Sequence, residues 1–282
     1  MKFEHTRTMN WEAAIRGMRN PLESHHKSDS LFGICDVRDA EQFDQAETKN
    51  LTGYLNMNPD QKAWITYLSF PYAEYVHIGE NDMDLAQRLI KGGSEHRKFM
   101  RQIFVSVDIT APIYWWKEFD TYKVGTVANS TSTMHKLATT PITKECFDTD
   151  DLIDYCTYME YGIDAYDWKG EYYDTYSADD LDGEIDKFIN ILEGFRRKYL
   201  ETKDKRYWKE LIRWLPESWL QTRTITLNYE NLLAMYNQRK NHKLNEWSGQ
   251  DNPTLVNFIS WVKQLPYANE LILVDAPVDK DD

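Results

Sequence analysis

The segment from Gln102 to Tyr122 constrains the fold of this chain more than any other stretch. Between Gln102 and Ile109, β-branched residues occupy every second position. Side chains of a strand alternate between its two faces, so this pattern predicts a strand with one buried face. The tripeptide Thr110 to Pro112 then offers a hydroxyl for a helix N-cap and a proline for the first turn, ahead of a helix over Ile113 to Tyr122. A strand that runs directly into a helix is expected.

Helical periodicity and end signals predict further helices. They are expected over Trp11 to Met18 (ended by Asn20-Pro21), Asp82 to Lys91 (stopped by Gly92-Gly93), Ser177 to Leu200 with Ser177 as its cap, and Pro216 to Lys240. The fold class is therefore predicted to be α/β, a mixed sheet with a large helical portion. No repeat and no Pro-rich or Ser/Gly-rich linker divides the chain, so one domain over residues 1–282 is expected, with a charged tail at 274–282.

Composition and charge narrow the class of protein. The 282 residues are 41% hydrophobic, which is enough to form a real core, and the formal net charge is −13. Such a charge repels nucleic acid and anionic lipid, so neither is an expected partner. Three scattered cysteines and no HxxxH spacing argue against a disulfide framework and against a metal site. Without an apolar leader or about 18 uninterrupted apolar residues, a cytoplasmic location is expected.

A basic segment runs from Gly92 to Arg101 in this otherwise acidic chain. It gathers His96, Arg97, Lys98 and Arg101. Like charges repel, so an anion is expected to compensate them. Two interpretations stay open: a bound phosphate, or a solvated turn that pairs with neighbouring carboxylates.

Lys123 to Lys136 concentrates small hydroxyl and amide side chains, among them Thr126, Asn129, Ser130 and Ser132. These groups can donate to phosphate or sugar oxygens, although a plain polar loop has the same composition. Neither a Walker A loop nor a GxGxxG motif is present.

Asn228 to Trp247 places Arg239 and His242 three residues apart, close to one helical turn. Both side chains could therefore reach one ligand. Basic residues at the end of a helix also suit the helix dipole, which is a structural explanation of equal weight.

Taken together, these segments resemble the flavin-dependent thymidylate synthase family over about 92–247, whereas residues 1–90 are atypical of it. The family's strand-to-helix unit is matched by Ala111-Pro112-Ile113-Tyr114, and Gly93 to His96 is similar to its Gly-His flavin segment. Its signature RHRxxSxNExSxR can be laid on Tyr122, Lys123, Thr126, Asn129 and Ser132, with one residue inserted near Ala128. Its C-terminal helix is matched by Thr222-Arg223, Asn228, Leu232, Arg239 and His242.

The chain departs from the signature at charged positions. The opening Arg-His-Arg falls on Thr121, Tyr122 and Lys123, the Glu falls on Ser130, and the last Arg falls on Met134. Lysine cannot reproduce the bidentate geometry with which arginine binds phosphate. The resemblance therefore implies a divergent member, with a changed substrate, a changed flavin pose or lost activity as the alternatives.

The resemblance implies methylation of deoxyuridylate, with methylenetetrahydrofolate as carbon donor and reduced flavin (FAD) as hydride source. Arg239 would be catalytic by polarising the pyrimidine, since no cysteine stands in the Pro-Cys-His context of the classical enzymes. The flavin contacts implied are His96, Lys98, Tyr122, Lys123, Asn228 and His242. The substrate contacts implied are Glu118, Thr126, Asn129, Ser130, Ser132, Arg213 and Arg239. A homotetramer is also implied. Alternatives are a non-catalytic nucleotide-binding or assembly protein of the same fold, and a related pyrimidine-nucleotide (hydroxy)methylase.

Overall fold

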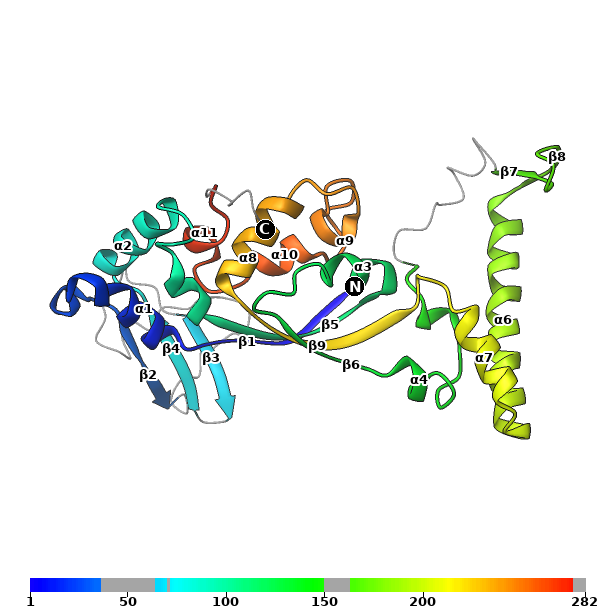
Figure 1. Cartoon of the computed structure of the whole chain (residues 1–282), viewed down its shortest axis with the longest axis horizontal. Helices are drawn as coiled ribbons and strands as arrows, with labels where there is room; N and C mark the ends of the chain where they lie inside the picture. Colours follow the sequence, from blue (N-terminus) through cyan, green and yellow to red (C-terminus); the bar gives the residue numbers. More distant parts are fainter. Residues whose placement is uncertain (37–63, 70–71, 150–162, 276–282) are drawn as a thin grey trace. The chain divides into compact units, whose positions relative to one another are not determined.

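A computed structural model describes residues 1–36, 64–69, 72–149 and 163–275 of the chain. The strands are β1 (Lys2–Met9), β2 (Leu31–Asp36), β3 (Trp64–Ser69), β4 (Tyr72–His77), β5 (Phe104–Pro112), β6 (Val127–Ser130), β7 (Ile163–Tyr166), β8 (Tyr172–Tyr176) and β9 (Leu220–Asn228). The helices are α1 (Trp11–Arg19), α2 (Glu80–Lys91), α3 (Ile113–Phe119), α4 (Thr133–Lys136), α6 (Ala178–Thr202), α7 (Lys205–Arg213), α8 (Tyr229–Arg239), α9 (Asn245–Ser248), α10 (Phe258–Val262) and α11 (Ala268–Leu271). The predicted α/β class is confirmed (Figure 1).

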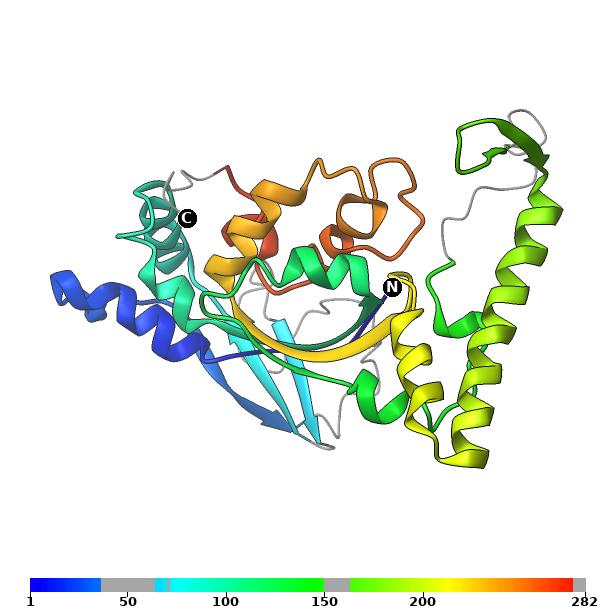
Figure 2. The same cartoon turned by 45° about the vertical axis from the view of Figure 1, so that its right-hand side comes forward.

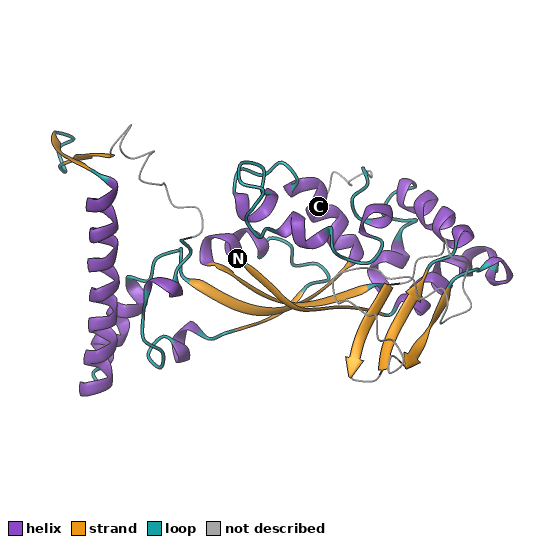
Figure 3. Cartoon of the chain, turned by 180° about the vertical axis from the view of Figure 1, so that it is seen from behind, coloured by secondary structure: helices purple, strands orange, loops and turns teal. Residues whose placement is uncertain are grey.

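Three sheets are formed by the described residues. One has the order β1-β5-β9-β6, a second has the antiparallel order β2-β4-β3, and the third is the hairpin β7-β8 (Figure 3). The chain divides into two compact units. Unit 1 comprises Met1–Lys2, Ile109–Thr121 and Asn129–Arg223, and unit 2 comprises Phe3–Asp108, Tyr122–Ala128 and Thr224–Asp282. Strands β5 and β9 contribute residues to both units. The expected single domain stays a prediction.

Strand β5 confirms the alternating pattern of the sequence. Ile103, just before it, and Val105 and Val107 within it are buried, whereas Phe104 is exposed. The strand continues through Pro112, which is itself the N-cap residue of α3. The expected cap at Thr110 is therefore wrong, because its hydroxyl instead lies 2.7 Å from that of Thr222. Helix α3 ends at Phe119, three residues before the predicted end.

The predicted helix over Pro216 to Lys240 is wrong in its first half. Residues Leu220–Asn228 form strand β9, and helix α8 begins only at Tyr229. The physical reason lies in the sequence LQTRTITLN, in which β-branched residues alternate and favour an extended backbone. Asn228 then ends the strand and caps the helix, since its side chain accepts a hydrogen bond from the backbone N–H of Asn231 at 2.9 Å.

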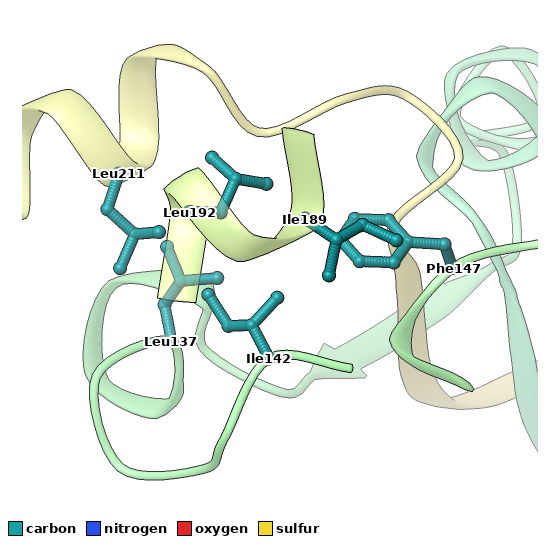
Figure 4. Packing of buried hydrophobic residues seen from close by; sticks show 6 residues of the cluster. All are labelled: Leu137, Ile142, Phe147, Ile189, Leu192 and Leu211. Atoms are coloured by element: carbon teal, nitrogen blue, oxygen red, sulfur yellow. The ribbon is translucent and has the colours of Figure 1, made fainter. Parts of the chain in front are cut away.

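Helices α6 and α7 of unit 1 pack against residues 137–147 through an apolar cluster. Its fully buried or nearly buried members are Leu137, Ile142, Phe147, Ile189, Leu192 and Leu211 (Figure 4). Ser177 forms the predicted cap of α6 through a capping box with Asp180. Glu193 of α6 accepts the backbone N–H of Ile142 at 2.9 Å, which ties the helix to the loop that carries part of the cluster.

Unit 2 contains a buried ionic contact between α1 and α2. Asp82 is fully buried, and its carboxylate accepts from Arg19 Nε at 2.5 Å and from the hydroxyls of Ser28 and Ser30 at 2.6 Å. Burial alone would raise the pKa of Asp82, but these hydroxyl and guanidinium donors outweigh it and lower the pKa below its ordinary value. The carboxylate therefore anchors the segment after α1 to the start of α2.

Candidate functional site

The end of helix α8 in unit 2 presents an arginine that contacts two aromatic rings. Arg239 Nε donates a hydrogen bond to Tyr122 Oη at 2.8 Å, and this hydroxyl donates to Gln238 Oε1 at 2.8 Å. The guanidinium carbon lies 4.9 Å from the ring centroid of Trp247 and 5.5 Å from that of Tyr122. These distances are within the range of cation–π attraction. We call Arg239, Tyr122, Gln238, Trp247 and His242 the Arg239 cluster.

His242 completes the cluster beside Trp247. The two rings lie 6.3 Å apart in an edge-to-face arrangement. His242 Nδ1 accepts a hydrogen bond from the backbone N–H of Leu244 at 3.2 Å. Because Nδ1 acts as an acceptor, the proton of the neutral imidazole is on Nε2.

The loop from Tyr122 to Thr126 lies against α8. Asn231 Nδ2 donates to the carbonyl of Val124 at 2.8 Å, and Thr126 Oγ1 donates to the carbonyl of Tyr122 at 2.5 Å. Gly125 has φ 76°, and a Cβ at this position would come within 2.9 Å of Asn228 Nδ2. Only glycine meets both conditions without strain. The loop thereby fixes Tyr122 against Arg239.

Asn228, an expected flavin contact, is buried and serves the helix itself. Its side-chain oxygen accepts the Asn231 N–H, and the Asn231 side chain accepts the backbone N–H of Asn228 at 3.2 Å. This reciprocal capping supports both α8 and the loop next to it. The role of Asn228 toward a flavin stays a prediction.

The basic segment next to α8 is compensated by carboxylates. Arg97 Nε lies 3.1 Å from Glu230 Oε1, and Arg101 pairs with the same carboxylate. Lys98 pairs with Glu95 at 2.8 Å. Of the two interpretations, the structure therefore supports pairing with neighbouring carboxylates for these three cations. The side chains of His96 and Lys98 are exposed, and both lie in unit 2 with the Arg239 cluster.

The other predicted substrate residues lie in unit 1. Asn129 and Ser130 are exposed and belong to β6, and Ser132 is exposed and lies just before α4. Between them, the backbone N–H of Thr131 donates to the carbonyl of Thr222 at 2.9 Å. Glu118 lies on α3, and Arg213 ends α7, where it pairs with Glu210. Unit 2 thus brings together Tyr122, Thr126, Arg239 and His242, with exposed Lys123 in the same loop.

Two members of the Arg239 cluster were not predicted as site residues. Trp247 is fully buried and lies on α9, five residues after His242. Gln238 precedes Arg239 and is exposed, so helical periodicity marks it only as a surface residue. The available signal was an aromatic residue shortly after the basic run RKNHK, since aromatic faces attract guanidinium groups.

Among the residues that the structure describes, no group of three or more His, Cys, Asp or Glu side chains could hold a metal ion. No helix in the described ranges has both the length and the apolar character needed to cross a bilayer.

Comparison with solved structures places the fold. The chain is similar to the flavin-dependent thymidylate synthase of Helicobacter pylori, solved in complex with FAD and dUMP, at 14% identity and a TM-score of 0.52. The match covers 96% of this chain and 98% of that one. A second structure of that enzyme with FAD and dUMP gives 14% identity and a TM-score of 0.49, over 96% and 97% of the two chains. A UMP/dUMP methylase from Streptomyces cacaoi, bound with 5-Br UMP, gives 13% identity and a TM-score of 0.38, over 56% and 64%.

No protein-family model matches the sequence, and no curated protein matches it. At 14% identity the likeness to the Helicobacter pylori enzyme shows the fold alone, and it extends over nearly the whole of both chains. The chain therefore has the fold of a flavin-dependent thymidylate synthase, as its sequence motifs predict.

Proposed function

We propose that this protein is a flavin-dependent enzyme that methylates the pyrimidine ring of deoxyuridylate, with methylenetetrahydrofolate as carbon donor and reduced FAD as hydride source. The observation that carries the proposal is the Arg239 cluster. The cluster orients Arg239, which is the residue that the sequence resemblance assigns to pyrimidine activation. The fold supports it, because a protein of this fold was solved with FAD and dUMP.

The donors of the cluster suit a planar ring that carries carbonyl oxygens. Arginine is a permanent cation, so Arg239 supplies a fixed positive charge, and His242 adds an imidazole to the same cluster. Half-buried Tyr122 adds an aromatic ring beside these donors, and fully buried Trp247 supports that ring and the guanidinium from within the core. Both a pyrimidine dione and the isoalloxazine of FAD have this chemistry, so the residues present fit either ring. Bound FAD would supply the hydride, and exposed His96, Lys98 and Lys123 are the proposed contacts for its phosphates.

Arg239 would stabilise the negative charge that develops on a pyrimidine carbonyl oxygen when the ring is activated. A fixed cation lowers the barrier only if it is already oriented before the charge appears. Tyr122 provides that orientation, because its hydroxyl accepts from Nε while its ring and that of Trp247 both lie against the guanidinium. No cysteine nucleophile is needed for this form of activation.

A second candidate is a protein that binds the nucleotide without turnover. The observation that favours it is the sequence itself, since Thr121 and Met134 stand where the resemblance expects arginines. Loss of two phosphate-binding guanidinium groups would weaken catalysis more than folding. The assembly into a homotetramer is also a proposal, and sedimentation velocity of the purified protein tests it.

The proposed reaction is tested by mass spectrometry of the nucleotide after incubation with dihydroflavin and methylenetetrahydrofolate. We expect dUMP to gain the mass of CH2, because a methyl group replaces the hydrogen on C5 of the ring. Gain of a hydroxymethyl group would instead assign the related (hydroxy)methylase. Binding of dUMP with no change in mass would favour the non-catalytic candidate.

Arg239→Gln should abolish turnover, and Arg88→Gln is the matched control. Arg88 is an exposed arginine of unit 2 that pairs with Asp84 at 2.8 Å within α2. Equal activity of the two variants would refute the role of Arg239.

A further inference from the structure

The hairpin β7-β8 in unit 1 is a well-defined turn with two short strands. Ile163 pairs with Tyr176 and Asp164 with Thr175 in antiparallel register. The Asp167 carboxylate caps the turn by accepting the backbone N–H groups of Lys169 and Glu171 at 2.8 and 2.9 Å. Figures 1 and 2 show the hairpin beyond the N-terminal end of α6.

Large aromatic side chains on this hairpin face solvent. Tyr166, Tyr172 and Tyr173 are 61%, 62% and 72% exposed, and Trp168 at the turn is 89% exposed. The rings of Tyr166 and Tyr172 pack edge to face at 6.4 Å. Tyrosine and tryptophan are enriched at the centres of protein interfaces, where they supply contact area at low entropic cost. So dense a group of exposed rings indicates a binding surface.

Among the described residues, no further strand pairs with the hairpin. The described residues place only β7 and β8 in this sheet, so each strand has an outer edge. A two-stranded hairpin is marginally stable alone in water, and a third strand would stabilise it. An extended segment of another chain could be added at either edge, with its backbone hydrogen bonds supplying affinity.

Charge selects the kind of segment that fits. Residues 163–187, the hairpin and the start of α6, contain nine Asp or Glu and two Lys, a formal net charge of −7 out of −13 for the whole chain. Glu171 and Asp174 are among the exposed carboxylates. A second copy of this hairpin would bring like charges together, which opposes self-association through this surface. Arginine suits it best, because guanidinium groups pair with carboxylates and stack on tyrosine rings.

We propose that the β7-β8 hairpin binds an extended, arginine-rich segment of a partner protein as an additional strand. The arginines of that segment stack on Tyr166 and Tyr172 and pair with the carboxylates of the hairpin. This docking surface lies in unit 1 and does not depend on the proposed methylation.

The test is fluorescence anisotropy of the whole protein with a short labelled peptide in which arginine alternates with valine. Binding is expected, and it should weaken by about tenfold in Glu171→Lys/Asp174→Lys, because two attractive charges become repulsive. Trp168→Ala should weaken binding by a few-fold, since it removes an aromatic contact at the turn without touching the paired strand residues. Circular dichroism checks that both variants keep the fold.

The matched control is Glu145→Lys/Glu201→Lys, which changes net charge equally at exposed positions of unit 1. It should leave affinity nearly unchanged. A second peptide with proline in place of valine keeps its charge but cannot pair as a strand, and it should bind more weakly.

In the binding assay, the proposal is overturned by no binding of the arginine-valine peptide, by equal loss in the control variant, or by equal binding of the proline peptide. Sedimentation velocity that shows an oligomer dissociated by the Glu171→Lys/Asp174→Lys pair would overturn it in favour of self-association.

Discussion

Tyr122→Phe tests how the guanidinium of Arg239 is held. The substitution removes the hydroxyl that accepts from Arg239 Nε at 2.8 Å, and it keeps the ring that lies 5.5 Å from the guanidinium carbon. It also removes the donor to Gln238, which is exposed and can turn to water. The substitution therefore removes one charge-assisted hydrogen bond from Arg239 and one neutral hydrogen bond to Gln238.

The size of the effect follows from that hydrogen bond. A hydrogen bond to a charged group contributes about 1.5 to 3 kcal/mol, and the half-buried position of both side chains favours the lower end. At about 1.4 kcal/mol for each factor of ten, affinity for dUMP should fall by about tenfold. The stacking between Arg239 and Trp247 at 4.9 Å should keep part of the orientation, so binding should not disappear.

Isothermal titration calorimetry with dUMP measures the effect. Tyr236→Phe is the matched control, because Tyr236 lies on the same helix and contacts Lys240 through its ring at 5.4 Å. The control should bind dUMP as the unmodified protein does. If Tyr122→Phe also binds dUMP with unchanged affinity, then the hydroxyl does not position Arg239 for a nucleotide and the reasoning fails.

Three further predictions concern Glu193 in unit 1 and Asp82 and Gly125 in unit 2. The pKa of Glu193 is lowered from 4.5 to about 2, because hydrogen bonds from Arg196, then from the Ile142 N–H and from Arg197, outweigh the effect of burial. A carboxylate whose pKa is lower in the folded state stabilises the fold, here by about 3 kcal/mol. This stabilisation is complete above pH 4.5 and is lost as the pH falls towards about 2. The free energy of unfolding of Glu193→Gln should be lower than that of the unmodified protein at neutral pH, and this gap should shrink as the pH falls. A gap that stays constant across pH would contradict the prediction. Asp82→Asn should lower the free energy of unfolding by about 3 kcal/mol or more, because it leaves the buried Arg19 guanidinium without its counter-charge, and thermal denaturation that shows no loss would disprove this. Gly125→Ala should cost about 1 to 2 kcal/mol through strain at φ 76° and should weaken dUMP binding with it, whereas an unperturbed variant would show that the loop tolerates a side chain.

Local patterns in the sequence predict those elements whose signals are themselves local. The alternation around Val105 and Val107 gives β5, and Ser177 with Asp180 gives the start of α6. The same reasoning fails at Leu220–Asn228, where a prediction of one long helix passes over the alternating β-branched residues. Thr110 offers a plausible cap, but a hydroxyl partner on β9 changes its role. Both errors come from tertiary pairing of β5 and β9, which a local window does not contain.

The candidate site likewise combines features that the sequence predicts with features that only the fold reveals. The spacing of Arg239 and His242 is visible in the sequence, because both lie within about one helical turn. The partner of Arg239 is Tyr122, which is 117 residues away in the chain, and no periodicity links the two. Only the resemblance to a family signature singled out Tyr122. The sequence leaves either a phosphate or a carboxylate as the anion that compensates Arg97. The fold identifies the carboxylate of Glu230, which is 133 residues away in the chain.

The proposed function requires that this chain hold a flavin and a pyrimidine nucleotide together. Titration of the purified protein with FAD, in the presence and absence of dUMP, tests it most directly through the visible absorbance of the flavin. We predict a saturable spectral shift that dUMP alters in the unmodified protein and in Arg88→Gln, but not in Arg239→Gln. Free-flavin absorbance throughout, with all FAD removed on gel filtration, would contradict the claim.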